Sequence, residues 1–389
     1  MPENFYPRMP PGNASIPFNR PHMTGHELRY IAQAHSQGRL AGDGPFTGLC
    51  HDWLEKQTGS VRALLTHSCT AALEMAALLI GIEPGDEIIL PSFTFVSTAN
   101  AFVLRGAKPV FVDIRPDTLN MDETLIEAAI SPRTKAIVVV HYAGVSCEMD
   151  SILNIAKTHG LSVVEDAAQG VMASYKGRPL GSLGDLGCFS FHETKNVISG
   201  EGGALLVNDE SNVLNAEIIR EKGTNRSQFF RGEIDKYTWQ SIGSSFLPGE
   251  LTAAFLWAQL EEAASITNMR MTLWNNYHRI LEPLELSGAL RRPIIPKDCT
   301  HNAHLYYVLL APELSRDDVL RSLKSAGIHA VFHYVPLHSA PAGRQFCTTS
   351  GELAVTDDLS ARLIRLPMWI GLSEEQQIYI GEVLSTLVG

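Results

Sequence analysis

Residues 135–168, KAIVVVHYAGVSCEMDSILNIAKTHGLSVVEDAA, alternate between two structural periods and decide the fold class. The apolar runs KAIVVVHYAG (135–144) and LSVVEDAA (161–168) predict two strands. Between them, MDSILNIAKTHG (149–160) has apolar residues at helical spacing and ends on a glycine, which predicts a helix. A strand, a helix and a second strand at this rhythm indicate a parallel sheet covered by helices on both faces.

The same rhythm extends in both directions from this unit. Further strands are predicted over VRALLT (61–66), DEIILP (86–91), KPVFVDI (108–114), GCFSFHETKN (187–196) and GGALLVND (202–209). Helices are predicted over TAALEMAALLIGI (70–82) and TANAFVLRG (98–106). The strands are continuously apolar, as expected when both faces of a sheet are buried. The sequence therefore predicts an α/β protein.

The chain is long enough for two domains, since its 389 residues exceed what one small core usually holds. Residues 250–284 predict a long helical stretch that leaves the first domain. Beyond them, strand patterns such as HLYYVLLA (304–311) mix with helical ones such as SEEQQIYIGEVLSTLV (373–388), which indicates a smaller α+β domain. We expect a flexible extension at 1–15, a large domain at 16–265 and a small C-terminal domain at 266–389.

Composition and charge exclude several classes of function. The formal net charge is −11, and an acidic surface argues against non-specific nucleic-acid binding. No apolar stretch reaches the length of a membrane span, and the N-terminus lacks the features of a signal peptide. The six cysteines are scattered without zinc-ligand spacing. We therefore expect reduced thiols in a cytoplasmic protein, with no metal site and no contact with a membrane.

Three features follow the ends of predicted strands, where functional residues of open α/β sheets gather. Asp166 ends the strand at 161–168, and an acid placed there is costly unless it is paired or used. Ser68, Cys69 and Thr70 open a helix, where free backbone N–H groups can hold a phosphate, although a serine there is more often simply an N-cap. Lys195 follows another strand and precedes a glycine-rich turn; a lone lysine is usually a surface residue.

Together, a lysine, an acid and a phosphate cradle are what pyridoxal phosphate (PLP) needs. The lysine forms a Schiff base, the acid holds the proton on the pyridine nitrogen, and the cradle binds the phosphate. Phe95, after the strand at 86–91, is a candidate for stacking on the ring, with ordinary core packing as the alternative. No GxGxxG motif follows the first strand, which disfavours a dinucleotide-binding enzyme.

Several motifs in order resemble the DegT/DnrJ/EryC1/StrS family of sugar aminotransferases. They are PSFTFVSTANAFVLRGAKPVFVDI (91–114), VVEDAAQG (163–170) and SFHETKN (190–196) followed by GEGG (200–203). The resemblance extends from IPFNRP (16–21) to RLPMW (365–369). It implies the type I fold of PLP-dependent aminotransferases, with a mixed, mostly parallel sheet in the large domain and a smaller α+β C-terminal domain.

The resemblance also implies roles for individual residues. Lys195 would be the Schiff-base lysine and Asp166 the partner of the pyridinium nitrogen. Further implied contacts with PLP are the Cys69 backbone, Thr70 and Ser190 at the phosphate, Gln169 on the side of the ring hydroxyl, and Phe95 over the ring. Ser245 stands where many members have an asparagine that helps to hold the phosphate, so this contact across the dimer stays open.

Within the family, HETKN (192–196), REKGTNRSQFFRG (220–232) and FHYVPLH (332–338) resemble the members that make dTDP-4-amino-4,6-dideoxygalactose. The implied reaction is amination of C4 of a dTDP-4-keto-6-deoxyhexose, with glutamate as the donor and 2-oxoglutarate as the by-product. A homodimer with shared active sites is implied. The implied substrate contacts are Asn225, Arg226, His333 and Tyr334.

The basic group Arg220, Lys222, Arg226 and Arg231 is a candidate site for the diphosphate of the sugar nucleotide. Without the resemblance, we would interpret the same segment as a solvated surface loop. Two alternatives to amine transfer are a PLP-dependent sugar dehydratase, in which histidine replaces the lysine, and a non-catalytic regulatory relative. The presence of both Lys195 and Asp166 favours the aminotransferase.

Overall fold

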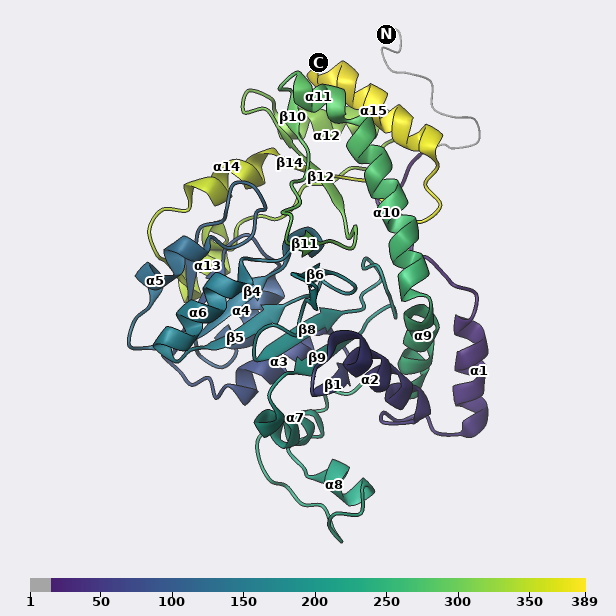
Figure 1. Ribbon diagram of the computed structural model, residues 1–389, viewed down its shortest axis with the longest axis vertical. Coiled ribbons are helices and arrows are strands. Elements are labelled where there is room, and N and C mark those ends of the chain that lie inside the picture. Colours follow the sequence, from purple (N-terminus) through teal and green to yellow (C-terminus); the bar gives the residue numbers. More distant parts are fainter. Residues whose placement is uncertain (1–14) are drawn as a thin grey trace.

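The computed structural model describes residues 15–389, and an eight-stranded sheet forms its centre (Figure 1). From one edge to the other the strands are β1 (Arg62–Thr66), β9 (Gly203–Val207), β8 (Leu186–Ser190), β5 (Ser162–Asp166), β4 (Thr134–Val140), β2 (Glu87–Pro91), β3 (Lys108–Val112) and β13 (Thr348–Thr349). Strand β9 runs antiparallel to β1 and β8, whereas all other neighbours in this sheet are parallel. The predicted mixed, mostly parallel sheet is confirmed. Apart from Ser15, the predicted extension at 1–15 lies outside the described residues.

The strand–helix–strand unit that opened the sequence argument is present as predicted. It consists of β4, α6 (Met149–His159) and β5, with β4 and β5 paired in parallel. Helix α6 ends at Gly160, whose φ of 64° lies in the left-handed region that glycine adopts at little cost. The predicted helices that follow β1 and β2 are α3 (Cys69–Leu79) and α4 (Val96–Val103).

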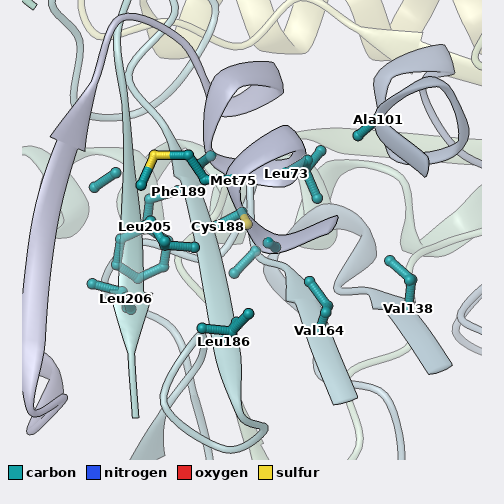
Figure 2. Packing of buried hydrophobic residues seen from close by; sticks show 14 of the residues in the cluster. Leu73, Met75, Ala101, Val138, Val164, Leu186, Cys188, Phe189, Leu205 and Leu206 are labelled. Atoms are coloured by element: carbon teal, nitrogen blue, oxygen red, sulfur yellow. The ribbon is translucent and has the colours of Figure 1, made fainter. Parts of the chain in front are cut away.

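Helices cover the central sheet, whose strands are buried almost throughout. Helix α3 packs against β1, β8 and β9, and Figure 2 shows Leu73 and Met75 of α3 close to Cys188 and Leu205 of these strands. The other helices of this part are α1 (Glu27–Gln37), α2 (Pro45–Thr58), α5 (Ile126–Ala129), α7 (Val213–Arg220), α8 (Arg226–Phe230) and α9 (Glu250–Glu261). The sequence patterns do not predict α1 or α2, since both expose mainly polar residues and contact α9 through few apolar ones.

The helical stretch expected over 250–284 is three helices in the structure, namely α9, α10 (Ala263–Ile280) and α11 (Glu282–Leu286). Pro283 lies in the first turn of α11, where the missing N–H of proline is tolerated and a new helix begins. Helix α10 starts in the core of the central sheet at Ala263 and ends in a second core that contains Trp274 and Tyr277 (Figure 1). It therefore connects the two cores, as the sequence predicts for this stretch.

The second core lies around an antiparallel sheet of three strands. The strands are β10 (Leu290–Arg291), β12 (Tyr306–Leu310) and β14 (Leu363–Leu366). The helices of this C-terminal region are α12 (Arg316–Ser325), α13 (Pro341–Phe346), α14 (Ala354–Arg362) and α15 (Glu374–Val388). A third small sheet contains β11 (Cys299–Thr300), β6 (Ser174–Tyr175) and β7 (Arg178–Pro179).

The chain crosses between the two cores more than once. Ile16 is fully buried in the second core, where its backbone bonds to Gly327 and His329. In the other direction, β13 adds to the central sheet beside β3, and Leu337 and Leu353 belong to the first core. The division into 16–265 and 266–389 therefore stays a prediction about domains.

Two negative findings hold for the described part of the chain. Between residues 15 and 389, no helix combines the length and apolar character needed to cross a membrane, and no group of three or more acidic, histidine or cysteine side chains is arranged to hold a metal ion. All six cysteines are free thiols.

A buried carboxylate at the end of β5 holds one end of the sheet together. Glu165 is fully buried and accepts hydrogen bonds from the backbone N–H groups of Gly181 (2.8 Å), Leu183 (2.6 Å) and Gly184 (2.7 Å). His141 Nδ1 accepts from the Cys147 N–H, so its Nε2 carries the hydrogen that is donated to Glu165 at 2.8 Å. Four donors thus converge on one carboxylate, which fixes the loop before β8.

We expect Glu165→Gln to lower the free energy of unfolding by roughly 3 kcal/mol, because an amide presents an N–H₂ group to donors that need an acceptor. Urea unfolding of the PLP-free protein, followed by circular dichroism, measures the change. The control is Glu313→Gln, an exposed acid without a hydrogen bond or ion pair among residues 15–389. Equal unfolding curves for the two variants would contradict the structural role of Glu165.

Candidate active site

Lys195 and Asp166 meet at the carboxyl ends of two parallel strands. Asp166 is the last residue of β5, and Lys195 lies in the connection between β8 and β9. Since β5 and β8 are parallel neighbours, their carboxyl ends lie side by side at the same edge of the sheet. Burial lowers the pKa of the Lys195 amine, while the negative charge of Asp166 acts in the opposite direction. The site therefore favours a neutral amine more than water does.

Asp166 is buried and held in one orientation. The Thr98 hydroxyl donates to Asp166 Oδ2 at 2.6 Å, and the Ala168 N–H donates to Oδ1 at 3.2 Å. Thr98 is itself fully buried, and its oxygen lies 2.7 Å from that of the Thr94 hydroxyl. Burial raises the pKa of Asp166, and the hydrogen bonds from Thr98 and Ala168 partly offset this rise.

The start of α3 faces the same site with free backbone donors. Ser68 is the N-cap, and its hydroxyl accepts from the Ala71 N–H at 3.1 Å. The N–H groups of Cys69 and Thr70 have no acceptor among the described residues, as is usual in the first turn of a helix. A β-carbon at Gly203 would lie 2.4 Å from the Ser68 carbonyl carbon, so only glycine lets β9 approach the helix so closely. The arrangement suits an anionic group.

Ser190 and Gln169 line one small pocket together with Lys195. Ser190 ends β8 and is buried. The Gln169 side chain is fixed at both ends, because its Oε1 accepts from the Ala143 N–H at 2.7 Å and its Nε2 donates to the Tyr334 hydroxyl at 3.1 Å. Tyr334 therefore connects the C-terminal part of the chain to the strand ends.

Phe95 stands at the N-terminus of α4 with 57% of its surface exposed. The alternative of core packing is therefore wrong, and the ring is free to contact a ligand. Its centroid lies 6.5 Å from that of Tyr334. His333 is adjacent, and its Nδ1 lies 3.1 Å from the Tyr142 hydroxyl oxygen. Burial, followed by the charges of Arg365 and Lys195, holds the pKa of His333 well below its usual value.

The structure adds residues that the sequence does not single out. His304 lines the Lys195 pocket, and its Nδ1 lies 3.0 Å from the Asn196 side-chain oxygen. Burial and the charge of Lys195 lower its pKa strongly. Nothing in the sequence distinguishes His304 or Thr98 from other residues of their type. Arg365 does carry a signal, since it interrupts the apolar strand LIRL at 363–366.

Asn225, Arg226 and Ser245 are not brought to the Lys195 pocket within one chain. Arg226 begins α8, which extends beyond the central sheet (Figure 1), and it lines a separate cleft of about 690 Å³. Its guanidinium lies 3.9 Å from Glu221. Asn225 accepts a hydrogen bond from the Thr238 N–H at 2.8 Å, and Ser245 is exposed on a segment that pairs with Glu221.

The basic group around Arg226 is less uniform than its sequence indicates. Arg220 is a buried helical residue that donates to Asp43 at 2.7 Å, so the interpretation as a solvated surface loop is wrong at this position. Arg231 is paired with Glu217 and Glu233. Among these arginines, only Arg226 is both half-exposed and weakly paired with an acid.

The residues at the strand ends fit PLP. The free N–H groups of α3 and the hydroxyls of Thr70 and Ser190 are suited to a phosphate, and the rigidly held carboxylate of Asp166 is suited to a protonated ring nitrogen. Lys195 is half-buried, and desolvation lowers the pKa of its amine. The close approach of Gly203 keeps the first turn of α3 beside the end of β8.

Comparison with known proteins agrees with this fit. A profile of the DegT/DnrJ/EryC1/StrS aminotransferase family matches residues 21–385. GDP-perosamine synthase of Caulobacter vibrioides is 33% identical over 358 residues, which cover 91% of this chain and 93% of that protein.

Two solved structures have the same fold over nearly their whole length. Spr1654 of Streptococcus pneumoniae in its PLP form has a TM-score of 0.88 and 25% identity, covering 96% of this chain and 98% of that one. DesI, crystallised in the presence of its TDP-sugar product, has a TM-score of 0.86 and 27% identity, covering 96% of this chain and 92% of that one.

We expect Thr98→Val to move the acidic limb of the pH–activity profile to higher pH. The hydrogen bond from Thr98 lowers the pKa of Asp166. Its loss raises that pKa, so the carboxylate becomes protonated, and activity is lost, at a less acidic pH. Thr98→Ser keeps the hydroxyl and should keep the wild-type profile. Identical profiles for the valine and serine variants would show that this hydrogen bond does not tune Asp166.

Proposed function

The chain belongs to the DegT/DnrJ/EryC1/StrS aminotransferase family, and we propose that it aminates C4 of a dTDP-4-keto-6-deoxyhexose with glutamate as the amino donor. It is a PLP-dependent sugar aminotransferase. The observation that carries the proposal is the convergence of the Lys195 amine, the Asp166 carboxylate and the free N-terminus of α3 at neighbouring strand ends. Two observations support a dTDP-linked sugar as the substrate. They are the structural similarity to DesI, which was crystallised in the presence of its TDP-sugar product, and the motifs at 192–196 and 220–232.

The buried residues divide the chemistry between them. When bound, PLP serves as an electron sink, which lets an amino group pass between an amino acid and a keto compound. The Asp166 carboxylate holds the proton on the ring nitrogen, and the Thr98 hydroxyl keeps that carboxylate in place. Lys195 Nζ, with its lowered pKa, takes the proton from the α-carbon of the donor and returns one to C4 of the sugar.

The remaining residues position the reactants. Cys69 and Thr70 would hold the phosphate through their free N–H groups, and Ser190 would add its hydroxyl. Phe95 would stack on the ring, and Gln169, whose amide is fixed by Tyr334, would contact the side of the ring hydroxyl. His333 and Tyr334 contact the sugar. Since both come from the C-terminal part of the chain, substrate binding joins the two cores.

A homodimer accounts for the position of Arg226. Helix α8 extends away from the Lys195 pocket of its own chain, and the segment carries exposed aromatic side chains at Phe230 and Trp239. We place Asn225 and Arg226 in the active site of the partner subunit, with Arg226 at the diphosphate of the sugar nucleotide. Ser245 is placed beside the PLP phosphate of the partner. The enzyme acts in the cytoplasm, consistent with its free thiols.

A GDP-linked keto sugar is a second candidate substrate. It is favoured by the 33% identity to GDP-perosamine synthase, a higher identity than that to DesI. The two candidates differ in the nucleoside, guanosine or thymidine, and not in the type of reaction at C4. Competition between the two nucleotide sugars for the purified enzyme separates them.

We expect the PLP-loaded enzyme to convert dTDP-4-keto-6-deoxyglucose and glutamate into a dTDP-4-amino-4,6-dideoxyhexose and an equal amount of 2-oxoglutarate. NMR of the product identifies the amine at C4 and its configuration. Lys195→Ala should form no product while keeping the wild-type circular dichroism spectrum. The matched control is Lys176→Ala, an exposed lysine paired with Asp150, which should remain active. Turnover by Lys195→Ala at the wild-type rate would contradict the assignment of Lys195 as the Schiff-base lysine.

We expect Arg226→Ala to raise the KM for the sugar nucleotide about ten- to a hundredfold, since a charge-assisted hydrogen bond contributes about 1.5–3 kcal/mol. The half-reaction with glutamate should be nearly unchanged, because glutamate has no diphosphate. Stopped-flow measurement of each half-reaction tests this, with the exposed Arg321→Ala as control. Equal damage to both half-reactions would point to a structural role for α8.

A further inference from the structure

We infer that Arg365 binds the carboxylate of the amino donor, and of the 2-oxo acid derived from it, at the Lys195 pocket. This inference rests on the proposed transamination and adds a recognition residue to it. Arg365 lies on β14, in the C-terminal part of the chain.

The Arg365 side chain lacks the partners that a guanidinium in the interior usually has. Its strand neighbours Ile364 and Leu366 are at most 1% exposed, so the strand is a core element. The Nε atom of Arg365 is buried and has no hydrogen-bond partner, and the guanidinium forms no ion pair with an acid among residues 15–389. Arg365 as a whole is half-buried, and a guanidinium that is partly withdrawn from water without a paired acid favours the binding of an anion from outside the chain.

A fully buried arginine of the same region, Arg270, shows what a structural role involves. Arg270 donates from Nε to the Ala303 carbonyl oxygen at 3.0 Å and from Nη2 to that of His304 at 2.6 Å. Those two bonds fix the 303–304 backbone, which precedes β12. Arg365 has no such task within the described chain. Its contact is with the ring of Phe18, whose centroid lies 4.8 Å from its Cζ, and this leaves the guanidinium edge free to donate.

The backbone places Arg365 next to residues of the pocket. Arg365 N donates to the Val331 carbonyl oxygen at 2.7 Å, and the Val331 N–H donates back at 3.1 Å. Two and three residues further along this segment lie His333 and Tyr334, and Tyr334 bonds to Gln169. The positive charge of Arg365 contributes to lowering the pKa values of both Lys195 and His333, which places it within electrostatic range of the reacting amine.

The chemistry of the reactants selects the ligand. Arginine presents a planar fork of donors that matches a carboxylate. An amino donor carries a carboxylate on the carbon that loses the amino group, so that this group must lie close to the Lys195 amine. The phosphate of PLP already has the N-terminus of α3 and Ser190. The diphosphate of the sugar nucleotide is the other anion available. If Arg365 bound it, a variant of Arg365 would impair the half-reaction with the sugar and not the half-reaction with the amino donor.

The first measurement uses the PLP-loaded enzyme and L-glutamate, without any sugar. Stopped-flow absorbance of the bound cofactor gives the glutamate concentration at half-maximal rate. Arg365→Met should raise that concentration about ten- to a hundredfold, and Arg365→Lys, which keeps the charge, should raise it less. Arg279→Met, a matched change at an exposed arginine, should leave it unchanged. Circular dichroism and PLP content verify that each variant is folded and loaded.

A second measurement does not depend on turnover. Calorimetric titration with glutarate, a dicarboxylate without an amino group, should show binding to the wild type and a loss of about tenfold or more in affinity for Arg365→Met. An unchanged response to both glutamate and glutarate in Arg365→Met would overturn the inference. A raised KM for the sugar nucleotide alone would overturn it as well, by assigning Arg365 to the diphosphate.

The outcome for the proposed function is separate. If the wild type binds glutarate through Arg365 but does not transfer an amino group to a nucleotide sugar, the proposed substrate fails and the role of Arg365 stands. If the sugar is aminated normally and Arg365→Met leaves both carboxylate measurements unchanged, the proposed function stands and the role of Arg365 fails.

Discussion

The scaffold and the site both depend on two adjacent carboxylates at the end of β5. Successive side chains of a strand point to opposite faces of the sheet, so Glu165 and Asp166 cannot share partners. Glu165 accepts three backbone N–H groups of the 181–184 loop and the ring N–H of His141. Asp166 accepts from Thr98 on α4 and from the Ala168 N–H. Glu165 therefore stabilises the fold, whereas the carboxylate of Asp166 remains available to a ligand.

Backbone groups provide much of the remaining binding capacity. The first turn of α3 offers free N–H groups, whose positions are fixed by the Ser68 cap and by the tight contact with Gly203. Donors of this kind lose no side-chain entropy when they bind an anion and need no reorganisation. The same pre-organisation holds Gln169 through Ala143 and Tyr334. A cofactor would thus enter a site whose groups are already in place.

The C-terminal part of the chain completes the pocket. Helix α10 carries the chain from the first core to the second, and the chain returns along the 331–334 segment and through β13, which joins the central sheet. Through this segment the Tyr334 hydroxyl accepts a hydrogen bond from Gln169, which lines the pocket of Lys195. A ligand in this pocket would lie between residues of both parts of the chain, an arrangement that helps to exclude water.

The sequence patterns by themselves predicted the type of the elements, a parallel sheet and the two central groups, since apolar periodicity and strand-end chemistry are local signals. The mixed character of the sheet followed from the family resemblance. Lys195 and Asp166 stand out because each follows an apolar strand. The division of residues 250–284 into three helices and the presence of α1 and α2 were not predicted. Both depend on packing against other elements, which the local sequence pattern does not reveal. Only the tertiary structure shows that Glu165 and Asp166 have different partners. It also shows that Arg220 is buried and that Phe95 is exposed. It also brought Thr98 to Asp166 and left Arg365 without an acid, because burial and partners are set by residues far apart in the chain.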